Sequence, residues 1–385
     1  MLRKTRTFLL TFFITLTLLI LFHSNSLNPS PPPRPPESAN ATLGFGTILA
    51  VSRPQFRRED SLLWAANLTE LSITVPSQPA WTEADLRAFH LEDESAISNG
   101  SALAWLGHLN ALRQILETEK ATALVIEDDV DWDISVRVHQ VPLLAAAIRK
   151  LLHREPTANT EPANYWAPTD QWDALYPGHC DDLLPPTSLS DPFHPLHHPH
   201  LLYADNTAPP FTLLHPDTSN FLRALGVPSG TRILHRTFAP FCTFAYAINR
   251  RSASTILREF AARREGVSAF DVQLLEACRH TLRCFSVSPE LFHHGDGGSA
   301  IASVDSGGAG VGGLASGLGK GTWNVGCGAR HGQLWVARDD DDGRARAKRV
   351  VGDMLERGQG ECPIDLLRAE RSWKGCEWGQ CGAQS

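Results

Sequence analysis

Residues 121–133 read ATALVIEDDVDWD, in which an apolar run changes abruptly to acidic residues. The run at 123–126 is typical of a strand that is buried on both faces of a sheet. Because ligands bind beyond the carboxyl ends of strands in open α/β sheets, the carboxylates that follow indicate a site. Clustered carboxylates repel one another unless a cation neutralises them, and oxygen ligands suit Mg²⁺ or Mn²⁺. The pattern therefore predicts a metal site, and a solvated acidic turn is the alternative.

The segments around this run alternate between strand and helix patterns. Residues 101–119 carry leucines at three- and four-residue steps, which predicts an amphipathic helix with Ser101 as its N-cap. A strand at 46–52, a helix up to residue 68 and a strand at 71–75 form a β-α-β beginning, which implies a parallel sheet flanked by helices. The further expected elements are helices at 143–152, 253–262 and 272–280 and strands at 172–176, 241–248 and 282–287.

Composition favours a globular protein. The chain has 385 residues, of which 42% are hydrophobic and 20% charged, so it can bury a large core. A net charge of -7 argues against a protein that coats nucleic acid, and we expect no nucleic-acid partner. Neither a heptad pattern nor a longer repeat is visible, which argues against coiled coils and solenoids.

The N-terminus predicts entry into the secretory pathway. Residues 8–22 read FLLTFFITLTLLILF and follow a basic flank of Arg3, Lys4 and Arg6. We expect a cytosolic tail at 1–6 and a signal-anchor transmembrane helix at 7–23, with the rest of the chain lumenal. This makes a single-pass type II protein of the Golgi or endoplasmic reticulum membrane. The apolar run is shorter than the roughly 20 residues of a usual span, so a cleaved signal peptide and a secreted product are the alternative.

The rest of the chain divides by composition. The sequence PSPPPRPP at 29–36 is a stiff extended spacer. Sequons at Asn40, Asn67 and Asn99 are usable only in a secretory lumen. The expected organisation is a proline-rich stem at 24–44, a catalytic domain at 45–294, a glycine-rich disordered loop at 295–321 and a C-terminal segment at 322–385. The charged stretch 338–349 is predicted to be solvated surface.

Eight cysteines suit an oxidising compartment. None form a C-x-x-C pair, so zinc-ribbon and thioredoxin-like folds lack support. Cys278 with Cys284 is one possible bridge, and pairing among Cys362, Cys376 and Cys381 is another. Core filling is the alternative for Cys242 and Cys278. The histidine-rich tract at 193–200 is interrupted by prolines and is predicted to be a loop or lid.

An ordered set of motifs resembles glycosyltransferase family 25, the group of lipooligosaccharide-biosynthesis enzymes and collagen galactosyltransferases. The resemblance spans about residues 47–294 and is strongest to fungal-type members. It consists of a histidine-bearing helix, a strand ending in E-D-D, and shorter matches in the same order. These are WLGHLNAL (105–112), ALVIEDDV (123–130), WD (172–173), YPGHC (176–180), CTFAYA (242–247), RRSA (250–253) and Asp271 with Leu274 and Leu275.

The resemblance implies a fold, a reaction and a cofactor. The fold is GT-A-like, an α/β architecture with a mixed Rossmann-like sheet between helices. The reaction is inverting transfer of a hexose, often galactose, from a nucleotide-sugar donor, with UDP-hexose the first expectation, to a hydroxyl of a glycan or protein acceptor. The cofactor is Mn²⁺ or Mg²⁺, which neutralises the charge that develops on the departing nucleoside diphosphate.

The resemblance also assigns roles by position. It implies that Glu127, Asp128 and Asp129 bind metal and diphosphate, with Asp131 in reserve and His293 or His294 completing the metal shell. Arg53 and Arg57 follow the first strand, where the family contacts the nucleotide, and arginine suits phosphate.

Two further positions are candidate catalytic residues. Asp271 is the candidate base toward the acceptor hydroxyl, and the alternative is a helix N-cap. His108 either reaches the site or packs in the core. Helix capping is the alternative role for Asp131.

Two other functions remain open at this point. One is a catalytically inactive GT-A-like binding or scaffold protein of the secretory pathway. The other is a metal-dependent hydrolase, which needs a second cluster of histidine and aspartate. Only residues 194–200 offer such a cluster, and prolines break it, so this function ranks last.

Overall fold

The computed structural model describes residues 37–52, 58–87, 97–152, 165–182, 190–260, 269–295, 322–332, 334–356 and 362. The described residues from Ser38 onward form one compact folded unit. The expected tail, signal anchor and proline spacer lie outside the described residues, as do nearly all of the glycine-rich loop and the last 23 positions. Among the helices that are described, none is both long and apolar enough to cross a membrane.

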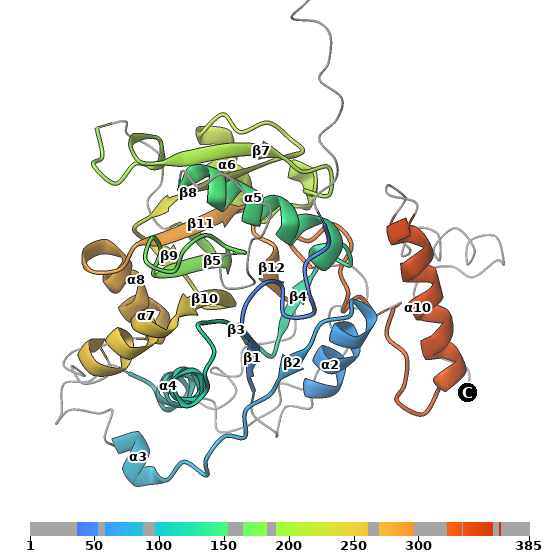
Figure 1. Cartoon of the computed structure of the whole chain (residues 1–385), viewed down its shortest axis with the longest axis horizontal. Helices are drawn as coiled ribbons and strands as arrows, with labels where there is room; N and C mark the ends of the chain where they lie inside the picture. Colours follow the sequence, from blue (N-terminus) through green and yellow to red (C-terminus); the bar gives the residue numbers. More distant parts are fainter. Residues whose placement is uncertain are drawn as a thin grey trace, which may run out of the picture. The chain divides into compact units, whose positions relative to one another are not determined.

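An eight-stranded mixed sheet forms the centre of the unit (Figure 1), in the order β2-β1-β3-β10-β5-β11-β8-β7. Its pairs β1–β2, β1–β3 and β5–β11 are parallel, and the other pairs are antiparallel. This confirms the α/β mixed sheet and its parallel beginning. The strands are β1 (Ile48–Val51), β2 (Ile73–Thr74), β3 (Thr122–Glu127), β5 (Ala174–Gly178), β7 (His200–Ala204), β8 (Thr231–Thr237), β10 (Ala245–Asn249) and β11 (Cys284–Ser288).

Strand β1 is the point from which the chain adds strands first on one side and then on the other. Helix α2 (Glu59–Leu68) carries the chain from β1 to β2 on one side, whereas α4 (Asn99–Glu117) carries it back to β3 on the other side. The carboxyl ends of β1 and β3 are therefore a topological switch point, where open α/β sheets bind their ligands. Helix α4 starts two residues earlier than predicted, because Ser98 is its N-cap and accepts a hydrogen bond from the Ser101 amide.

Alternation along the strands sends side chains to two buried faces. In β3, Leu124 and Ile126 face the core under α2 and α5 (Val141–Leu151), while Ala123 and Val125 face the core under α4. Helices α7 (Arg250–Thr255) and α8 (Phe270–His280) cover this second face together with α4 (Figure 1). Burial on both faces explains why the run at 123–126 is continuously apolar.

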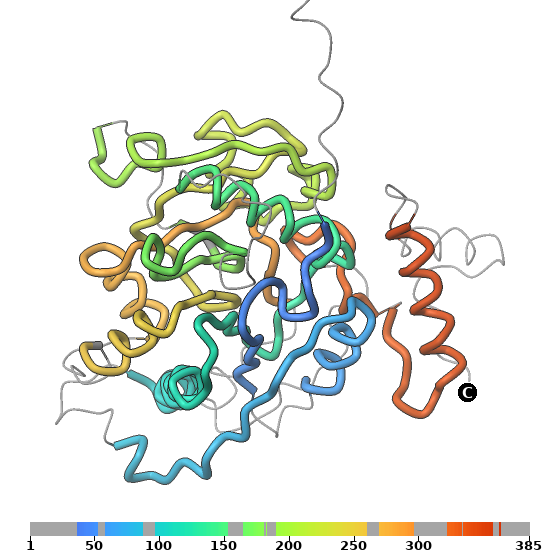
Figure 2. The backbone as a smooth tube through the Cα atoms, viewed as in Figure 1, coloured from blue at the N-terminus to red at the C-terminus, as the bar shows by residue number. Residues whose placement is uncertain are grey.

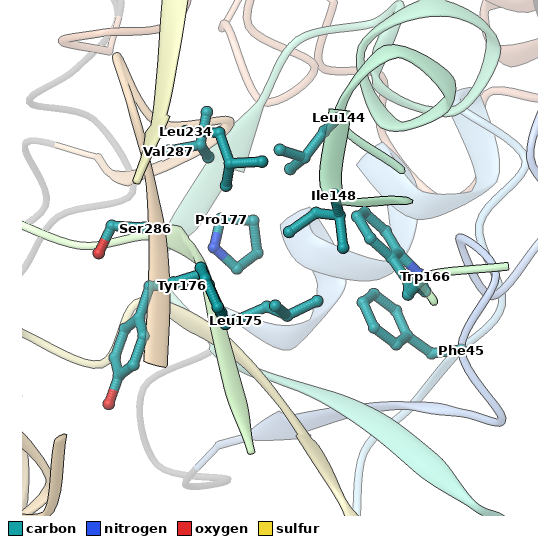
Figure 3. Close-up of a pocket in the computed structure, with 11 residues that line it drawn as sticks. Phe45, Leu144, Ile148, Trp166, Leu175, Tyr176, Pro177, Leu234, Ser286 and Val287 are labelled. Carbon is teal, nitrogen blue, oxygen red and sulfur yellow. The ribbon is translucent and has the colours of Figure 1, made fainter. Parts of the chain in front are cut away.

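A pocket under α5 belongs to this core (Figure 3). Its lining includes Leu144 and Ile148 of α5 and Leu175 and Val287 of the sheet. The hydroxyls of Tyr176 and Ser286 point away from it (Figure 3). Ligand sites need a few polar groups that fix orientation. The pocket lacks them and is a packing gap.

Two short ribbons and several helices complete the unit. Strand β4 (Val130–Trp132) pairs with β12 (Phe292–His294), and β6 (Asp181–Asp182) pairs with β9 (Pro240–Phe241). The remaining helices are α3 (Glu83–Arg87), the π-helices η2 (Val136–Gln140) and η6 (Ile256–Phe260), the 3₁₀ turns η4 (Pro195–His197) and η5 (Phe211–Leu213), α6 (Pro216–Ala224) and α10 (Asp341–Glu356).

Two sequence predictions need correction and one is confirmed. Residues 200–204, at the end of the expected lid, form edge strand β7, which pairs with β8. The stretch 338–349 is largely exposed, as predicted, although most of it lies within helix α10 (orange-red in Figure 2). Arg344 of α10 lies 4.6 Å from the Trp64 ring of α2. The folded unit also begins earlier than residue 45, because Ala39 and Leu43 of the expected stem are buried.

Disulfides join Cys180 to Cys242, Cys278 to Cys284 and Cys327 to Cys362. The second of these confirms a predicted bridge. Core filling by free Cys242 and Cys278 is wrong, because both are bonded, and Cys362 pairs outside the tail trio. Three bridges suit an oxidising compartment.

The bridges should differ in their contribution to stability. Cys180–Cys242 closes a separation of 62 residues and Cys278–Cys284 one of 6. In the chain-entropy account, serine at both positions of the first pair should cost about 2 kcal/mol more free energy of unfolding than serine at both positions of the second. Urea unfolding of the two double variants measures the difference. Equal losses would show that the long loop is already restricted in the unfolded chain.

Candidate active site

The acidic turn, defined as Glu127, Asp128 and Asp129, lies between β3 and β4 at the sheet's switch point. The end of β1 lies beside it, since the Asp128 amide donates to the Val51 carbonyl at 3.1 Å. Strand β12 reaches the same place from far along the sequence, because its pairing with β4 sets His293 opposite Asp131. The fold therefore gathers the predicted acids and the late histidines at one edge.

Arg58 partly neutralises the charge of the turn, and Ser52 donates a hydrogen bond to it. Ser52 Oγ donates to Asp128 Oδ2 at 2.8 Å, and Arg58 Nη1 lies 3.0 Å from Asp129 Oδ2 and 3.4 Å from Asp128 Oδ1. The second oxygen of Asp129, Oδ1, is buried without a hydrogen-bond partner. Burial is the largest cause that raises the pKa of Asp129, to about 7, and the charges of Glu127 and Asp128 add to it. The positive charges of Arg58 and Arg330 lower that pKa but do not offset the rise. The turn therefore carries more negative charge than the nearby arginines compensate.

Arg330 braces the backbone of the turn from the C-terminal segment. Its Nη1 donates to the carbonyls of Asp128 and Val130, both at 2.7 Å, and its Nε lies 3.2 Å from Ser61 Oγ of α2. Its guanidinium also lowers the pKa of Asp129 electrostatically. A second cation is thus fixed at the site.

Glu127 faces the other side of the turn, toward α4. Its Oε1 accepts from Thr243 Oγ1 at 2.7 Å and lies 3.6 Å from His108 Nε2. Burial alone would raise the pKa of Glu127, but the hydrogen bond and charge of His108, together with Thr243, lower it. His108 is buried, contacts Tyr246 OH at 3.1 Å through Nδ1 and stacks on Phe270 at 4.5 Å. The two roles weighed for His108 therefore coexist, since it packs in the core and contacts the turn.

Asp271 lies in the first turn of α8, next to this group. Burial raises the pKa of Asp271, and the charge of Glu127 raises it by a smaller amount. Hydrogen bonds from the backbone amides of Val272 and Cys242 lower it. The Val272 amide lies 2.9 Å from Oδ1. The N-cap of α8 is Ala269, so the capping alternative for Asp271 is wrong. A carboxylate with a raised pKa suits a general base.

Asp131 plays a different role from the one expected. Its Oδ1 accepts from the amides of Trp132 and Arg330, at 2.8 and 2.9 Å, and its Oδ2 accepts from Thr322 Oγ1 at 2.9 Å. It lies in a strand, so it caps no helix. Both oxygens are occupied in anchoring residues 322–330, and Asp131 is therefore a structural carboxylate.

His293 is held by a carboxylate that the sequence analysis missed. Its Nδ1 lies 2.5 Å from Glu290 Oε1, which also accepts from Asn324 Nδ2 at 2.5 Å. All three residues are buried, and Nε2 of His293 has no hydrogen-bond partner. A carboxylate that accepts from one ring nitrogen fixes the histidine tautomer and leaves the lone pair on the other nitrogen. Histidines that bind metals are commonly held by a carboxylate in this way.

Arg53 and Arg57 lie outside the described residues, and the neighbouring Arg58 contacts the turn. In the histidine-rich tract, the rings of His194, His198 and His200 contact local backbone atoms. These contacts leave the hydrolase alternative without its second cluster within the described part of the tract.

Within the described ranges, no group of three or more His, Cys, Asp or Glu side chains is arranged to hold a metal alone. Mg²⁺ sites on phosphate substrates, however, use one or two carboxylates and complete the shell with phosphate and water. The buried, unpartnered oxygen of Asp129, beside Asp128, fits that kind of partial ligand set. Glu127 faces Thr243 and His108 and fits less well.

Sequence reasoning missed four residues that shape the site: Arg58, Thr243, Glu290 and Arg330. Arg58 follows the candidate Arg57 and Thr243 lies within the motif CTFAYA, so their positions were an available signal. Arg330 contacts the turn from far along the sequence, and Glu290 contacts His293 and Asn324; neither belongs to a recognised motif.

Comparisons by sequence give this chain no relatives, since no known protein family and no curated protein matches it. The motif resemblance and the geometry of the acidic turn are therefore the grounds for a functional proposal.

Proposed function

We propose that this protein is a metal-dependent glycosyltransferase with a GT-A-like fold, of the family 25 type. It transfers a hexose, with galactose the first candidate, from a UDP-sugar to a hydroxyl acceptor with inversion. The observation that carries the proposal is the acidic turn at the switch point, where Asp129 keeps a buried unpartnered oxygen. Nucleotide ligands bind at such switch points in open α/β sheets.

In this proposal Asp129 and Asp128 would hold the cation, with His293 the candidate ligand from β12. When bound, Mn²⁺ or Mg²⁺ supplies a Lewis acid that stabilises charge on the leaving diphosphate. Arg58 is the N-cap residue of α2 and contacts both Asp128 and Asp129, so it lies within reach of an anion brought to the turn. Its guanidinium suits phosphate oxygens. Arg330 keeps the turn's carbonyls fixed meanwhile.

Asp271 is the proposed base. The acceptor hydroxyl loses its proton to the Asp271 carboxylate as its oxygen bonds to the anomeric carbon of the donor. The bond from that carbon to the diphosphate oxygen breaks in the same displacement, and the nucleoside diphosphate leaves with the electron pair. The His108–Glu127–Thr243 group fixes the wall behind the turn through hydrogen bonds. Attack from the face opposite the leaving group inverts the anomeric centre.

The compartment belongs to the same proposal. A type II protein anchored by residues 7–23 in the Golgi or endoplasmic reticulum membrane, with its folded unit in the lumen, fits the basic flank and the three disulfides. Secretion after signal cleavage is the competing outcome. Alkaline extraction of membranes distinguishes them, because an anchored chain stays in the pellet.

The test is a donor panel. Wild-type protein is incubated with UDP- and GDP-hexoses and Mn²⁺, and release of nucleoside diphosphate is measured with and without EDTA. We expect EDTA-sensitive turnover of at least one UDP-hexose and an Mn²⁺-dependent rise of the melting temperature with UDP. Absence of both would overturn the enzyme proposal.

The second candidate is an inactive GT-A-like scaffold. One observation favours it: Arg58 already pairs with Asp128 and Asp129 and supplies part of the counter-charge that a metal would provide. A scaffold of this kind should show no stabilisation by UDP with Mn²⁺ in the same melting experiment.

Glu290 should act as a positioning residue. Glu290→Ala removes the acceptor for His293 Nδ1, and loss of such a partner typically lowers metal affinity or activity by roughly 10–100-fold. We expect that drop in kcat/KM and in apparent Mn²⁺ affinity, with partial rescue in Glu290→Gln, whose amide oxygen still accepts the bond. Equal Mn²⁺ affinity in all three proteins would contradict the assignment and leave Glu290 as a tie to Asn324.

A further inference from the structure

The turn at residues 40–45, where the folded unit begins, presents one exposed side chain from a fixed backbone. Ala39 and Leu43 are buried, and the Ala39 amide donates to the Arg137 carbonyl at 2.9 Å. Trp166 Nε1 donates to the Leu43 carbonyl at 2.9 Å. Asn40 lies between these two anchored residues and is exposed. Its side chain therefore projects from the surface at a defined place.

The side-chain amide of Asn40 uses its oxygen in the turn and leaves its nitrogen unbonded. Oδ1 accepts from the backbone amides of Thr42 and Gly44, at 3.1 and 2.8 Å, and Thr42 Oγ1 lies 3.1 Å from it. Within the described ranges Nδ2 forms no hydrogen bond. Backbone amides donate only to the oxygen of a carboxamide, so these bonds fix which of the two atoms faces the turn. Nδ2 is the atom left on the solvent side.

We infer that Asn40 carries an N-linked glycan, an inference that rests on the proposed lumenal location. Residues 40–42 read NAT, the asparagine–x–threonine pattern that a secretory lumen modifies when x is not proline. Nδ2 bonds to the anomeric carbon of an oligosaccharide carried on a lipid diphosphate and loses one proton. The bond from that carbon to the diphosphate oxygen breaks, and the lipid diphosphate leaves with the electron pair. The product keeps Oδ1 as an acceptor, so the turn keeps its hydrogen bonds.

The other two sequons become inaccessible when the chain folds. Asn67 is exposed on α2, but Thr69, whose hydroxyl its sequon requires, is 3% exposed and donates to a backbone carbonyl of the same helix. Asn99 is the first residue of α4, and Gly100, the middle residue of its sequon, is buried. Modification at either place must precede packing of the helix, whereas the first sequon lies in a surface turn. The structure therefore favours the first of the three.

The experiment isolates Asn40 by removing the other two sequons. The full chain is expressed in a eukaryotic secretory host as the double variant Asn67→Gln/Asn99→Gln, and its gel mobility is compared before and after treatment with peptide N-glycosidase. We expect a shift of one glycan, which Asn40→Asp in the same background abolishes. Aspartate is the matched replacement, because its carboxylate still accepts from the amides of Thr42 and Gly44 but has no nitrogen to modify.

A second pair of variants separates the sequon from the shape of the turn. In the same background, Thr42→Ser keeps the hydroxyl that the sequon requires and should keep the glycan. Thr42→Val replaces that hydroxyl with a methyl group of similar size and should lose the glycan. A shift that persists in Thr42→Val would overturn the assignment to Asn40.

The outcomes separate this inference from the proposals on which it rests. The absence of a shift in the double variant overturns the glycan at Asn40. Protease treatment of sealed membrane vesicles then shows whether the location fails as well, since a protected folded unit leaves the lumenal location standing and a digested one overturns both. The glycosyltransferase proposal is tested separately, because Asn40→Asp should keep the response of the melting temperature to UDP and Mn²⁺.

Discussion

Asp129→Asn is expected to lower kcat for sugar transfer by about a thousandfold, because the change removes the anionic oxygen that the proposal assigns to the cation. The amide is nearly isosteric, so the turn should keep its shape. Nucleoside diphosphate release from UDP-hexose with saturating Mn²⁺ measures the loss. Turnover within a factor of a few of wild type would exclude Asp129 as a metal ligand.

The same variant should report on stability in metal-free buffer. The folded pKa of Asp129, about 7, is raised above the unfolded value of about 3.9. Ionisation is therefore harder in the folded state, and the wild type loses stability as pH rises from about 4 to 7 and no further above that. Asparagine does not titrate, so the stability of Asp129→Asn relative to wild type should increase over that window and then level off. Urea unfolding with EDTA between pH 4 and 8 measures this.

Asp131→Asn is the matched control, because Asp131 lies two residues away and both of its carboxylate oxygens already accept hydrogen bonds. The Asp131 carboxylate accepts three hydrogen bonds, two of which, from Thr322 and Arg330, tie down residues 322–330. An amide can present only one acceptor oxygen, so this variant should lose stability instead of gaining it. If Asp131→Asn were as stable as wild type while Asp129→Asn unfolded, the functional and structural acids would have been exchanged.

The core strands were predictable because their burial pattern is local. Residues 123–126 are apolar without interruption, as a strand covered by helices on both faces must be, and β3 occupies that run. Strand β8 escaped prediction although it too lies inside the sheet, between β11 and β7. Its sequence TRILHRT contains Arg232 and His235, which are buried only because Asp205 and Asp182 neutralise them. A charge whose partner lies far along the sequence looks like surface when the sequence is read alone.

In the candidate site, too, the residues with a local sequence signal were predictable and those that act through distant contacts were not. The sequence indicates the acidic turn through the abrupt change at Glu127, and the motif order indicates Asp271 and His293. Glu290 and Arg330 give no such signal, because each contributes through contacts with distant backbone or with a histidine that the β4–β12 pairing positions. The resemblance likewise gives no sign of the contacts of Asp131, whose hydrogen bonds come mainly from the C-terminal segment beyond the matched motifs.

Asp205→Asn is expected to lower the free energy of unfolding by about 3–5 kcal/mol, since it leaves a buried guanidinium without its counter-charge. Arg232 is 1% exposed, and its Nε lies 2.6 Å from Asp205 Oδ2. Burial alone would raise the pKa of Asp205, but the Arg232 charge and the bonds from His139 and Thr207 hold that pKa well below its usual range. Urea unfolding at pH 7 measures the loss.

The pH dependence and an exposed ion pair provide the controls. Since the folded pKa of Asp205 is depressed, its stabilisation is present above about pH 4 and is lost as pH falls further, so wild type and variant should converge in acid. Arg251 pairs with Asp173 but is 61% exposed, so Arg251→Gln should cost no more than about 1 kcal/mol. A similar cost for both variants would mean that water reaches Arg232.

This ion pair also connects stability to the proposed chemistry. Arg232 Nη1 donates to the carbonyls of Pro289 and Glu290, and Glu290 in turn holds His293 beside the turn. Loss of Asp205 should therefore weaken apparent Mn²⁺ affinity at temperatures where the variant remains folded, whereas Arg251→Gln should not change it. If Asp205→Asn lost stability but kept full Mn²⁺ affinity, the buried pair would support the sheet alone, and His293 would not depend on the backbone that Arg232 braces.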